Sequence, residues 1–194
     1  RWKVLRRRAW CLGSTAAAAL FASPLHTFSM DSYPSHMAEH LLLVLVVAPL
    51  LVWGWRTSGV SPSWSVLPFL LYVALIPTYH LTPLGGLIMR SPGEHALELS
   101  LFALVGIALW VGPYGQRFTS MQRVTYVALA LPASIFSGVA LMSATTAPFN
   151  LMSMPHMPVD LHDLHQGGVA MAVLSALFLV VHIALLARID VRSR

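Results

Sequence analysis

Long apolar segments alternate along the chain with short stretches rich in proline, glycine and polar residues. A bilayer core of about 30 Å needs roughly 20 consecutive apolar residues in one helix, and each segment is close to this length. The pattern predicts about six transmembrane helices, at residues 9–25, 36–55, 66–81, 94–111, 123–145 and 162–187. We therefore expect an all-α integral membrane bundle, with residues 1–194 forming a single transmembrane helical domain.

The connecting segments carry the signals of turns. Residues 26–35 are predicted to be a loop between the first two helices, and the longest interruption runs from about residue 146 to residue 161. The basic start and the alanine-rich run of residues 9–25 also resemble a signal peptide. That run is long, however, and Ala22-Ser23-Pro24 is a poor cleavage site. We therefore interpret the run as the first membrane helix.

Composition supports a membrane protein, because 57% of the 194 residues are hydrophobic and only 10% are charged, against about 25% charged in soluble proteins. Cytoplasmic loops of membrane proteins collect lysine and arginine. If both termini lie in the cytoplasm, all twelve lysines and arginines except Arg90 fall on the cytoplasmic side. The net charge of +5 therefore needs no nucleic-acid partner, since these cations orient the chain and contact the anionic lipid of the bilayer.

The same topology collects the histidines at the outer ends of the helices. Of the nine histidines, only His182 falls toward the inner side. His36 and His40 stand four residues apart at the start of the second apolar segment, so both side chains share one helical face. A single histidine at a membrane surface is readily explained as an interfacial residue. Ionisable groups inside a membrane span are functional candidates, and the whole set favours a metal site on the outer face.

The choice of metal depends on how soft the ligands are. Imidazole suits copper, zinc and iron, whereas a thioether selects Cu(I). Met37 lies between the two histidines of the second segment, and a loop before the last segment carries further soft ligands at Met152, Met154, His156 and Met157. These residues favour copper over zinc, as Cu(I), with the loop as a candidate for copper capture. Met142 and Met171 are interpreted as packing residues of the bundle.

Other chemistries have less support. Histidines on two membrane helices can ligate haem without a local motif, as a pair such as His40 and His95 would, so haem stays open as an alternative cofactor. The zinc-protease motif His-Glu-x-x-His fails because Met37 stands where the glutamate is needed. The sequence also lacks the Gly-x-Ser-x-Gly elbow of serine hydrolases. We therefore expect a protein that is not an enzyme.

The segment His36-Met37-Ala38-Glu39-His40-Leu41-Leu42-Leu43 resembles the His-Met-x-x-His-Leu-Leu-Leu helix of the CtaG family, the assembly factors of caa-type cytochrome c oxidase. The resemblance extends to His80 near Pro77, to His95-Ala96-Leu97-Glu98 and to Asp163-Leu164-His165-Gln166-Gly167-Gly168. The sequence departs from the family pattern on helices two, four and six. The family tends to have glutamine at Glu39, Glu98 and His165, and a second histidine at Leu99.

The resemblance implies a multi-pass protein of the bacterial cytoplasmic membrane that supports assembly of a copper-containing oxidase. On this hypothesis the protein is a metallochaperone that binds copper at its outer face through His36, His40, His80, His95, Met37, His162 and His165. The carboxylates Glu39, Glu98 and Asp163 would accept hydrogen bonds from the histidines and fix their tautomers. The partner would be a subunit of cytochrome c oxidase or of another respiratory complex. The alternative is a non-catalytic accessory subunit of a respiratory or other membrane complex, whose histidines bind haem, lipid or nothing.

Overall fold

The computed structural model describes residues 2–22, 24–29, 31–55, 61–85, 92–115, 117–146 and 159–191. The elements of regular structure in these ranges are helical. They are α1 (Trp2–Ala22), α2 (Pro24–Ser29), α3 (Tyr33–Leu42), a π-helical segment (Leu43–Val47), α4 (Ala48–Gly54), a 3₁₀ turn (Pro62–Ser65), α5 (Val66–Leu81), α7 (Pro92–Tyr114), α8 (Ser120–Ala130), α9 (Pro132–Met142) and α10 (Leu161–Val191).

Five helical stretches are long and apolar enough to cross a membrane. They are Tyr33–Gly54, Pro62–Leu81, Gly93–Tyr114, Ser120–Met142 and Leu161–Ala187. They correspond to the second to sixth predicted helices, so the all-α membrane bundle is confirmed. The first predicted helix forms as α1, but Lys3 and the arginines at positions 6–8 occupy its first two turns. Helix α1 is long enough, but these charges exclude it from the five described stretches that are both long and apolar enough to cross a membrane.

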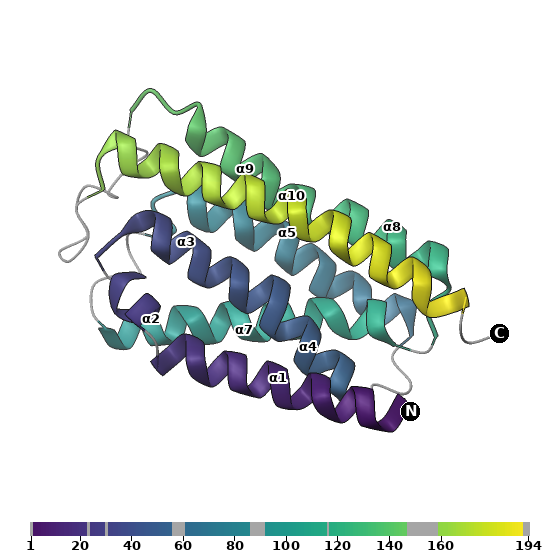
Figure 1. Ribbon diagram of the computed structural model, residues 1–194. Helices are drawn as coiled ribbons and strands as arrows, with labels where there is room; N and C mark the ends of the chain where they lie inside the picture. Colours follow the sequence, from purple (N-terminus) through teal and green to yellow (C-terminus); the bar gives the residue numbers. More distant parts are fainter. Residues whose placement is uncertain are drawn as a thin grey trace.

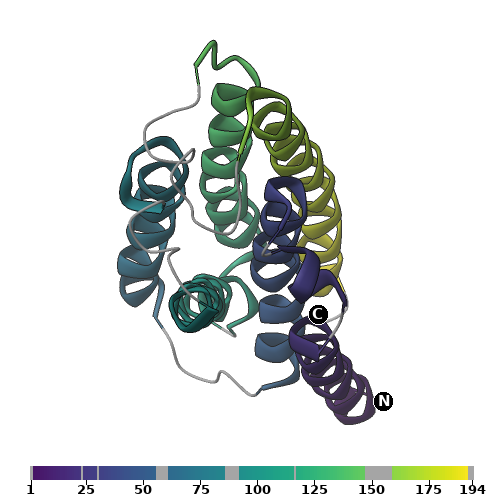
Figure 2. The same cartoon turned by 90° about the vertical axis from the view of Figure 1, so that its left-hand side faces the viewer.

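The long helices run side by side, so the bundle has two distinct ends (Figure 1). One end holds the start of α1, with the arginines at positions 6–8, and the connection from α7 to α8, with Arg117; we call it the basic end. The other holds α2 and the first turns of α3, α7 and α10; we call it the histidine end. Figure 2 looks along the bundle from the histidine end, where α3 packs against α10 and α1 lies at an outer corner.

The predicted loop at residues 26–35 is largely helical. Its first part belongs to α2, which begins at Pro24, and α3 begins at Tyr33, with Ser32 as its N-cap and Pro34 in its first turn. Proline is favoured at the first positions of a helix, because its fixed φ suits a helix and its missing N–H would have no helical partner there. Pro24 and Pro34 therefore begin helices, and the prediction of a loop over residues 26–35 is wrong for the residues that α2 and α3 contain.

A proline also shapes the middle of the second span. Pro49 has no N–H to donate, so a carbonyl in the preceding turn lacks its helical partner, and the helix widens there into the π-helical segment. Trp110 of α7 donates its Nε1–H to Val44 O at 2.7 Å. His182 of α10 donates its Nε2–H to Leu45 O at 2.9 Å. These two bonds satisfy buried carbonyls and hold α7 and α10 against the second span.

Glycines let α10 approach its neighbours closely. A Cβ atom on Gly138 of α9 would lie 2.7 Å from the carbonyl oxygen of Gly168. A Cβ atom on Gly167 would lie 2.5 Å from the ring of Tyr33 and 3.3 Å from Cγ of Met37, both on α3. Small residues allow such close contact between membrane helices. The packing of α10 on α3 places its inward face next to Met37.

Candidate metal centre

The second span presents its ionisable groups in its first turns, at the histidine end. The rings of His36 and His40 lie 4.2 Å apart between centroids, as their spacing of four residues predicts. Both are buried, with 0% and 2% of their surface exposed, and Glu39 between them is also at 0%. Buried ionisable groups are costly unless they are paired or bind an ion. Their partners come from α2, α5 and α7.

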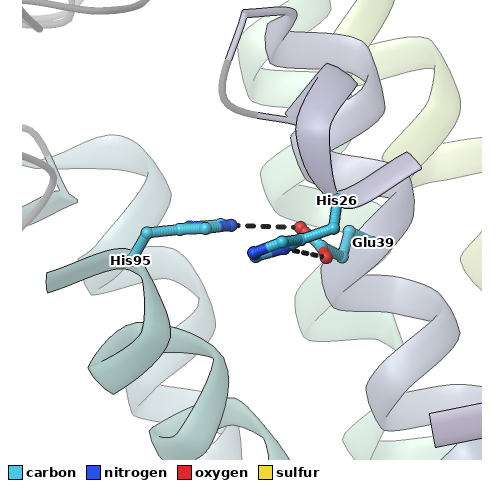
Figure 3. A group of neighbouring side chains, drawn as sticks. All are labelled: His26, Glu39 and His95. Carbon is cyan, nitrogen blue, oxygen red and sulfur yellow. Dashed lines mark hydrogen bonds and ion pairs between the residues drawn. The ribbon is translucent and has the colours of Figure 1, made fainter. Parts of the chain in front are cut away.

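The carboxylate of Glu39 is held between two imidazoles (Figure 3). Its Oε1 accepts a hydrogen bond from His26 Nδ1 of α2 at 2.9 Å, and its Oε2 accepts one from His95 Nε2 of α7 at 3.2 Å. The two rings lie nearly parallel, with centroids 5.2 Å apart. Ser29 Oγ lies 3.4 Å from His95 Nε2. Short helix α2 therefore contributes directly to the site.

The carboxylate of Glu98 is contacted from three helices. His36 Nε2 lies 3.1 Å from its Oε1, and Tyr79 of α5 donates its hydroxyl to the same oxygen. His95, one turn earlier on α7, contacts Oε2 through Nδ1 at 3.0 Å. His40 Nε2 also lies 3.1 Å from Oε1, but the angle between the groups is unsuited to a hydrogen bond. We therefore treat the His40 contact as electrostatic.

His95 thus bridges the two carboxylates. A carboxylate can only accept hydrogen bonds. Each of the two contacts that His95 makes therefore needs a proton or a cation on the imidazole nitrogen. Glu39, Glu98 and His95 are all buried, and water cannot screen the two negative charges. We call His26, His36, Glu39, His95 and Glu98 the histidine–carboxylate cluster. It contains two sets whose ligand atoms lie within 4.8 Å of one another: His26, Glu39 and His95, and His36, His95 and Glu98.

Several buried imidazole nitrogens have no hydrogen-bond partner among the described residues. They are His36 Nδ1, both ring nitrogens of His40, and His80 Nε2. His80 of α5 donates its other nitrogen, Nδ1, to Ile76 O at 2.7 Å. An unsatisfied buried polar atom costs about 1–3 kcal/mol, so such atoms call for an explanation. Metal binding is one such explanation, because a ligating imidazole nitrogen offers its lone pair to the ion.

The structure brings only part of the predicted set together. His36, His40 and His95 meet at the cluster with Glu39 and Glu98, and His80 stands beside His40, with ring centroids 6.1 Å apart. Met37 is buried next to them, at 1% exposed. Glu39 and Glu98 occupy the centre of the site, so they are placed to bind an ion themselves as well as to orient histidines.

The predicted residues of α10 have other contacts. His165 donates its Nε2–H to Ala144 O at 2.9 Å, and exposed His162 lies 2.9 Å from the side chain of Gln166. The backbone N–H of Asp163 donates to the Asp160 side chain at 2.8 Å. None of the three belongs to the two ligand sets found among the described residues. Met152, Met154, His156 and Met157 lie outside the described residues.

Two members of the site, His26 and Tyr79, are absent from the predicted set. The sequence pattern predicts His26 in a loop, and Pro24, as the start of a helix, is the signal that places it on α2. For Tyr79 the signal is burial, because a tyrosine buried in a membrane helix requires a partner for its hydroxyl. Leu99, where the family pattern has a histidine, is fully buried at 0% exposed. Glu98, one residue earlier, faces the histidines instead.

The fold and the site define a multi-pass helical membrane protein that gathers its buried ionisable groups at one end. The chain belongs to the Caa3_CtaG family, the cytochrome c oxidase caa3 assembly factors, whose profile matches residues 1–67 and 63–192.

Two mycobacterial proteins are similar to this chain. Uncharacterized protein ML1998 of Mycobacterium leprae is 26% identical over 226 residues, which cover 96% of this chain and 34% of that protein. Uncharacterized protein Mb0105 of Mycobacterium bovis is 24% identical over 205 residues, which cover 86% and 31%. The chain therefore spans about a third of the length of the curated relatives it matches. No solved structure matches it.

Proposed function

We propose that this protein is a non-catalytic assembly factor that binds copper at its histidine end and supplies it to a cytochrome c oxidase. The observation that carries the proposal is the histidine–carboxylate cluster. Its ligand atoms come from several helices, are buried except for those of half-buried His26, and form two sets that are each close enough together to share an ion. Together with the family of oxidase assembly factors, this cluster makes a metal the cargo best suited to the site.

The charge of the cluster supports a cation. Glu39 and Glu98 bring two negative charges into a buried site, and His95 contacts both carboxylates. A proton on each nitrogen of His95 gives a single positive charge, so the second negative charge must be offset by a proton on another imidazole of the cluster or by a bound cation. Burying an uncompensated charge is strongly unfavourable. A bound cation offsets it and stabilises the arrangement of the three helices.

The ligand types support copper. Imidazoles and carboxylates bind Cu(II) and Zn(II), whereas the thioether of Met37 beside them suits Cu(I). The space between His40 and His80 also favours a single ion over haem. It amounts to about 10 Å³ for the centre of a water molecule, which is roughly room for one water, whereas a cofactor pocket occupies several hundred Å³.

The distribution of basic residues supports an outward-facing site. The arginines at positions 6–8 and Arg117 lie at the basic end, opposite the cluster, and positive charge marks the cytoplasmic side. We infer that the histidine end faces outward. Copper could then be transferred to an oxidase subunit on that side without crossing the bilayer.

The test is the copper content of the purified chain. The double variant His95→Ala, Glu98→Gln removes two ligands that α7 contributes to the cluster. The control is His165→Ala, which removes a histidine at the same end of the bundle that donates to Ala144 O and lies outside the cluster. We expect about one copper or more per chain in the wild type and in His165→Ala, and loss of copper in the double variant. Thermal unfolding of each detergent-solubilised protein controls for folding. Full copper in a folded double variant would end the proposal.

A further inference from the structure

A small cavity lies beside the histidine–carboxylate cluster. Its polar and sulfur-bearing lining residues include His40 and Met37 of α3, His80 of α5 and Met171 of α10, and aliphatic and aromatic side chains line the rest. Its volume of about 10 Å³ for the centre of a water molecule is close to that needed for one water or one ion. We call these four residues the thioether cavity.

We propose that the thioether cavity is a second metal site, which binds a soft monovalent cation, Cu(I) or its analogue Ag(I), through two imidazoles and two thioethers. Met171 is thereby a ligand, although its sequence position suggests only packing. The assignment rests on the proposed function for the identity of the cargo. It adds a separate site for the cuprous form and a ligand on α10.

His80 is fixed in the form that a metal requires. Its Nδ1–H donates to Ile76 O at 2.7 Å, so in the neutral imidazole the lone pair sits on Nε2. That atom is buried and has no hydrogen-bond partner among the described residues. Metal-binding histidines commonly donate their other nitrogen to a carbonyl or carboxylate, which sets the tautomer and the ring orientation.

The ring of His40, which also lines the cavity, is held in place by an aromatic neighbour. It stacks on Phe102, with centroids 4.1 Å apart and an angle of 16° between planes. Nε2 lies near Glu98, and Nδ1 has no partner among the described residues. An ion lies about 2 Å from a ligating nitrogen and about 3 Å from the ring centre. Two rings that share an ion therefore have centroids up to about 6 Å apart, and those of His40 and His80 are 6.1 Å apart.

The two methionines supply soft ligands to the cavity. Met37 and Met171 are each 1% exposed and come from helices that Gly167 allows to touch. The carboxylates of Glu39 and Glu98 are absent from the cavity lining. Neutral imidazole and thioether ligands in an apolar surrounding suit a soft ion of single charge, whereas a divalent ion would be much costlier to bury there. The negative charge of Glu98 next to His40 offsets the single charge.

The two sites should therefore differ in the ions they prefer. The histidine–carboxylate cluster offers hard oxygen ligands and suits Zn(II) or Cu(II), and the thioether cavity suits Cu(I) or Ag(I). Because each site has ligands of its own, single substitutions can separate them. Met171→Leu and Met37→Leu keep the side-chain size and remove sulfur. Met142→Leu is the matched control, because Met142 is 42% exposed on α9.

The experiment titrates the purified full chain in detergent with Ag(I), which needs no reductant, and separately with Zn(II). We expect Met171→Leu and Met37→Leu to lower Ag(I) affinity by at least about tenfold with Zn(II) affinity unchanged. His95→Ala should show the reverse pattern, a loss of Zn(II) affinity with Ag(I) affinity unchanged, because His95 is absent from the cavity lining. Ag(I) affinities of both methionine variants equal to that of Met142→Leu would overturn the second site.

X-ray absorption of the Cu(I)-loaded wild type tests the same claim without a variant. We expect sulfur neighbours at about 2.3 Å, and a spectrum with only nitrogen and oxygen neighbours would contradict the thioether cavity. The two proposals fail separately. If Met171→Leu loses Ag(I) while oxidase assembly is normal in every variant, the site stands and the assembly role falls. If His95→Ala with Glu98→Gln loses copper and Met171→Leu binds Ag(I) normally, the assembly role stands and the second site falls.

Discussion

The substitution Glu98→Gln isolates the electrostatic part of the metal site. Glutamine keeps the size of the side chain and a carbonyl oxygen that accepts from Tyr79, but it removes the negative charge. The ligand atoms of His36, His95 and Glu98 lie within 4.8 Å of one another, so a bound ion lies within about 4 Å of the Glu98 carboxylate. For each unit of charge on the ion, the attraction at this distance is about 4 kcal/mol at an effective dielectric constant of about 20, which makes about 8 kcal/mol for Zn(II).

A loss of half of this attraction, about 4 kcal/mol, corresponds to roughly a thousandfold in affinity, since about 1.4 kcal/mol is a factor of ten. Glu39 stays in place and recovers part of this attraction, so we expect Zn(II) affinity to fall by about 100-fold to 1000-fold. The assay is competition with a coloured chelator for the purified protein in detergent. Asp160→Asn is the matched control, because it removes an exposed negative charge at the same end of the bundle and keeps an oxygen for the Asp163 N–H. A Glu98→Gln affinity within a factor of about three of that control would refute the electrostatic reasoning.

Three further outcomes follow from the structure. His26→Ala removes one contact to Glu39, and Zn(II) affinity in the same assay should fall by less than in Glu98→Gln; an equal or larger fall would contradict the central place of Glu98. Trp110→Phe leaves Val44 O without its donor, so unfolding in denaturant should show a loss of about 1–3 kcal/mol, whereas Trp64→Phe, at a residue 77% exposed, should show none. Gly138→Ala places a Cβ 2.7 Å from Gly168 O, and size-exclusion chromatography should show a reduced yield of folded protein; a normal yield would contradict the close packing of α9 on α10.

Much of the fold could be predicted because membrane helices are marked by length and hydropathy alone. The uniform apolar character of residues 66–81 and 162–187 is enough to place α5 and α10. The boundaries at the histidine end are harder to predict, because Pro24 and Pro34 can either begin a helix or break one. The structure shows that both begin helices, and this brings His26 to Glu39.

The site, too, could be predicted only in part. His36 and His40 share a helical face by spacing alone, and His95 with Glu98 follows the same rule on α7. The relation between helices cannot be read from spacing, so Met171 and Tyr79 become visible only once the helices are packed. On α10, however, the inward face is periodic, through Leu164, Gly168 and Met171.

His162 and His165 fall outside that inward face. A helical period applied to α10 therefore separates them from the site. The prediction used the membrane level of each histidine and not its direction around the helix, so it could not exclude these two residues.

The most direct measurement of the central claim is the copper content of the oxidase isolated from cells in which this protein is replaced by a variant. With His95→Ala and Glu98→Gln combined, the account predicts an oxidase depleted of copper, and full copper with wild-type protein or with His165→Ala. An oxidase with full copper in cells carrying only the double variant would contradict copper supply by the histidine end.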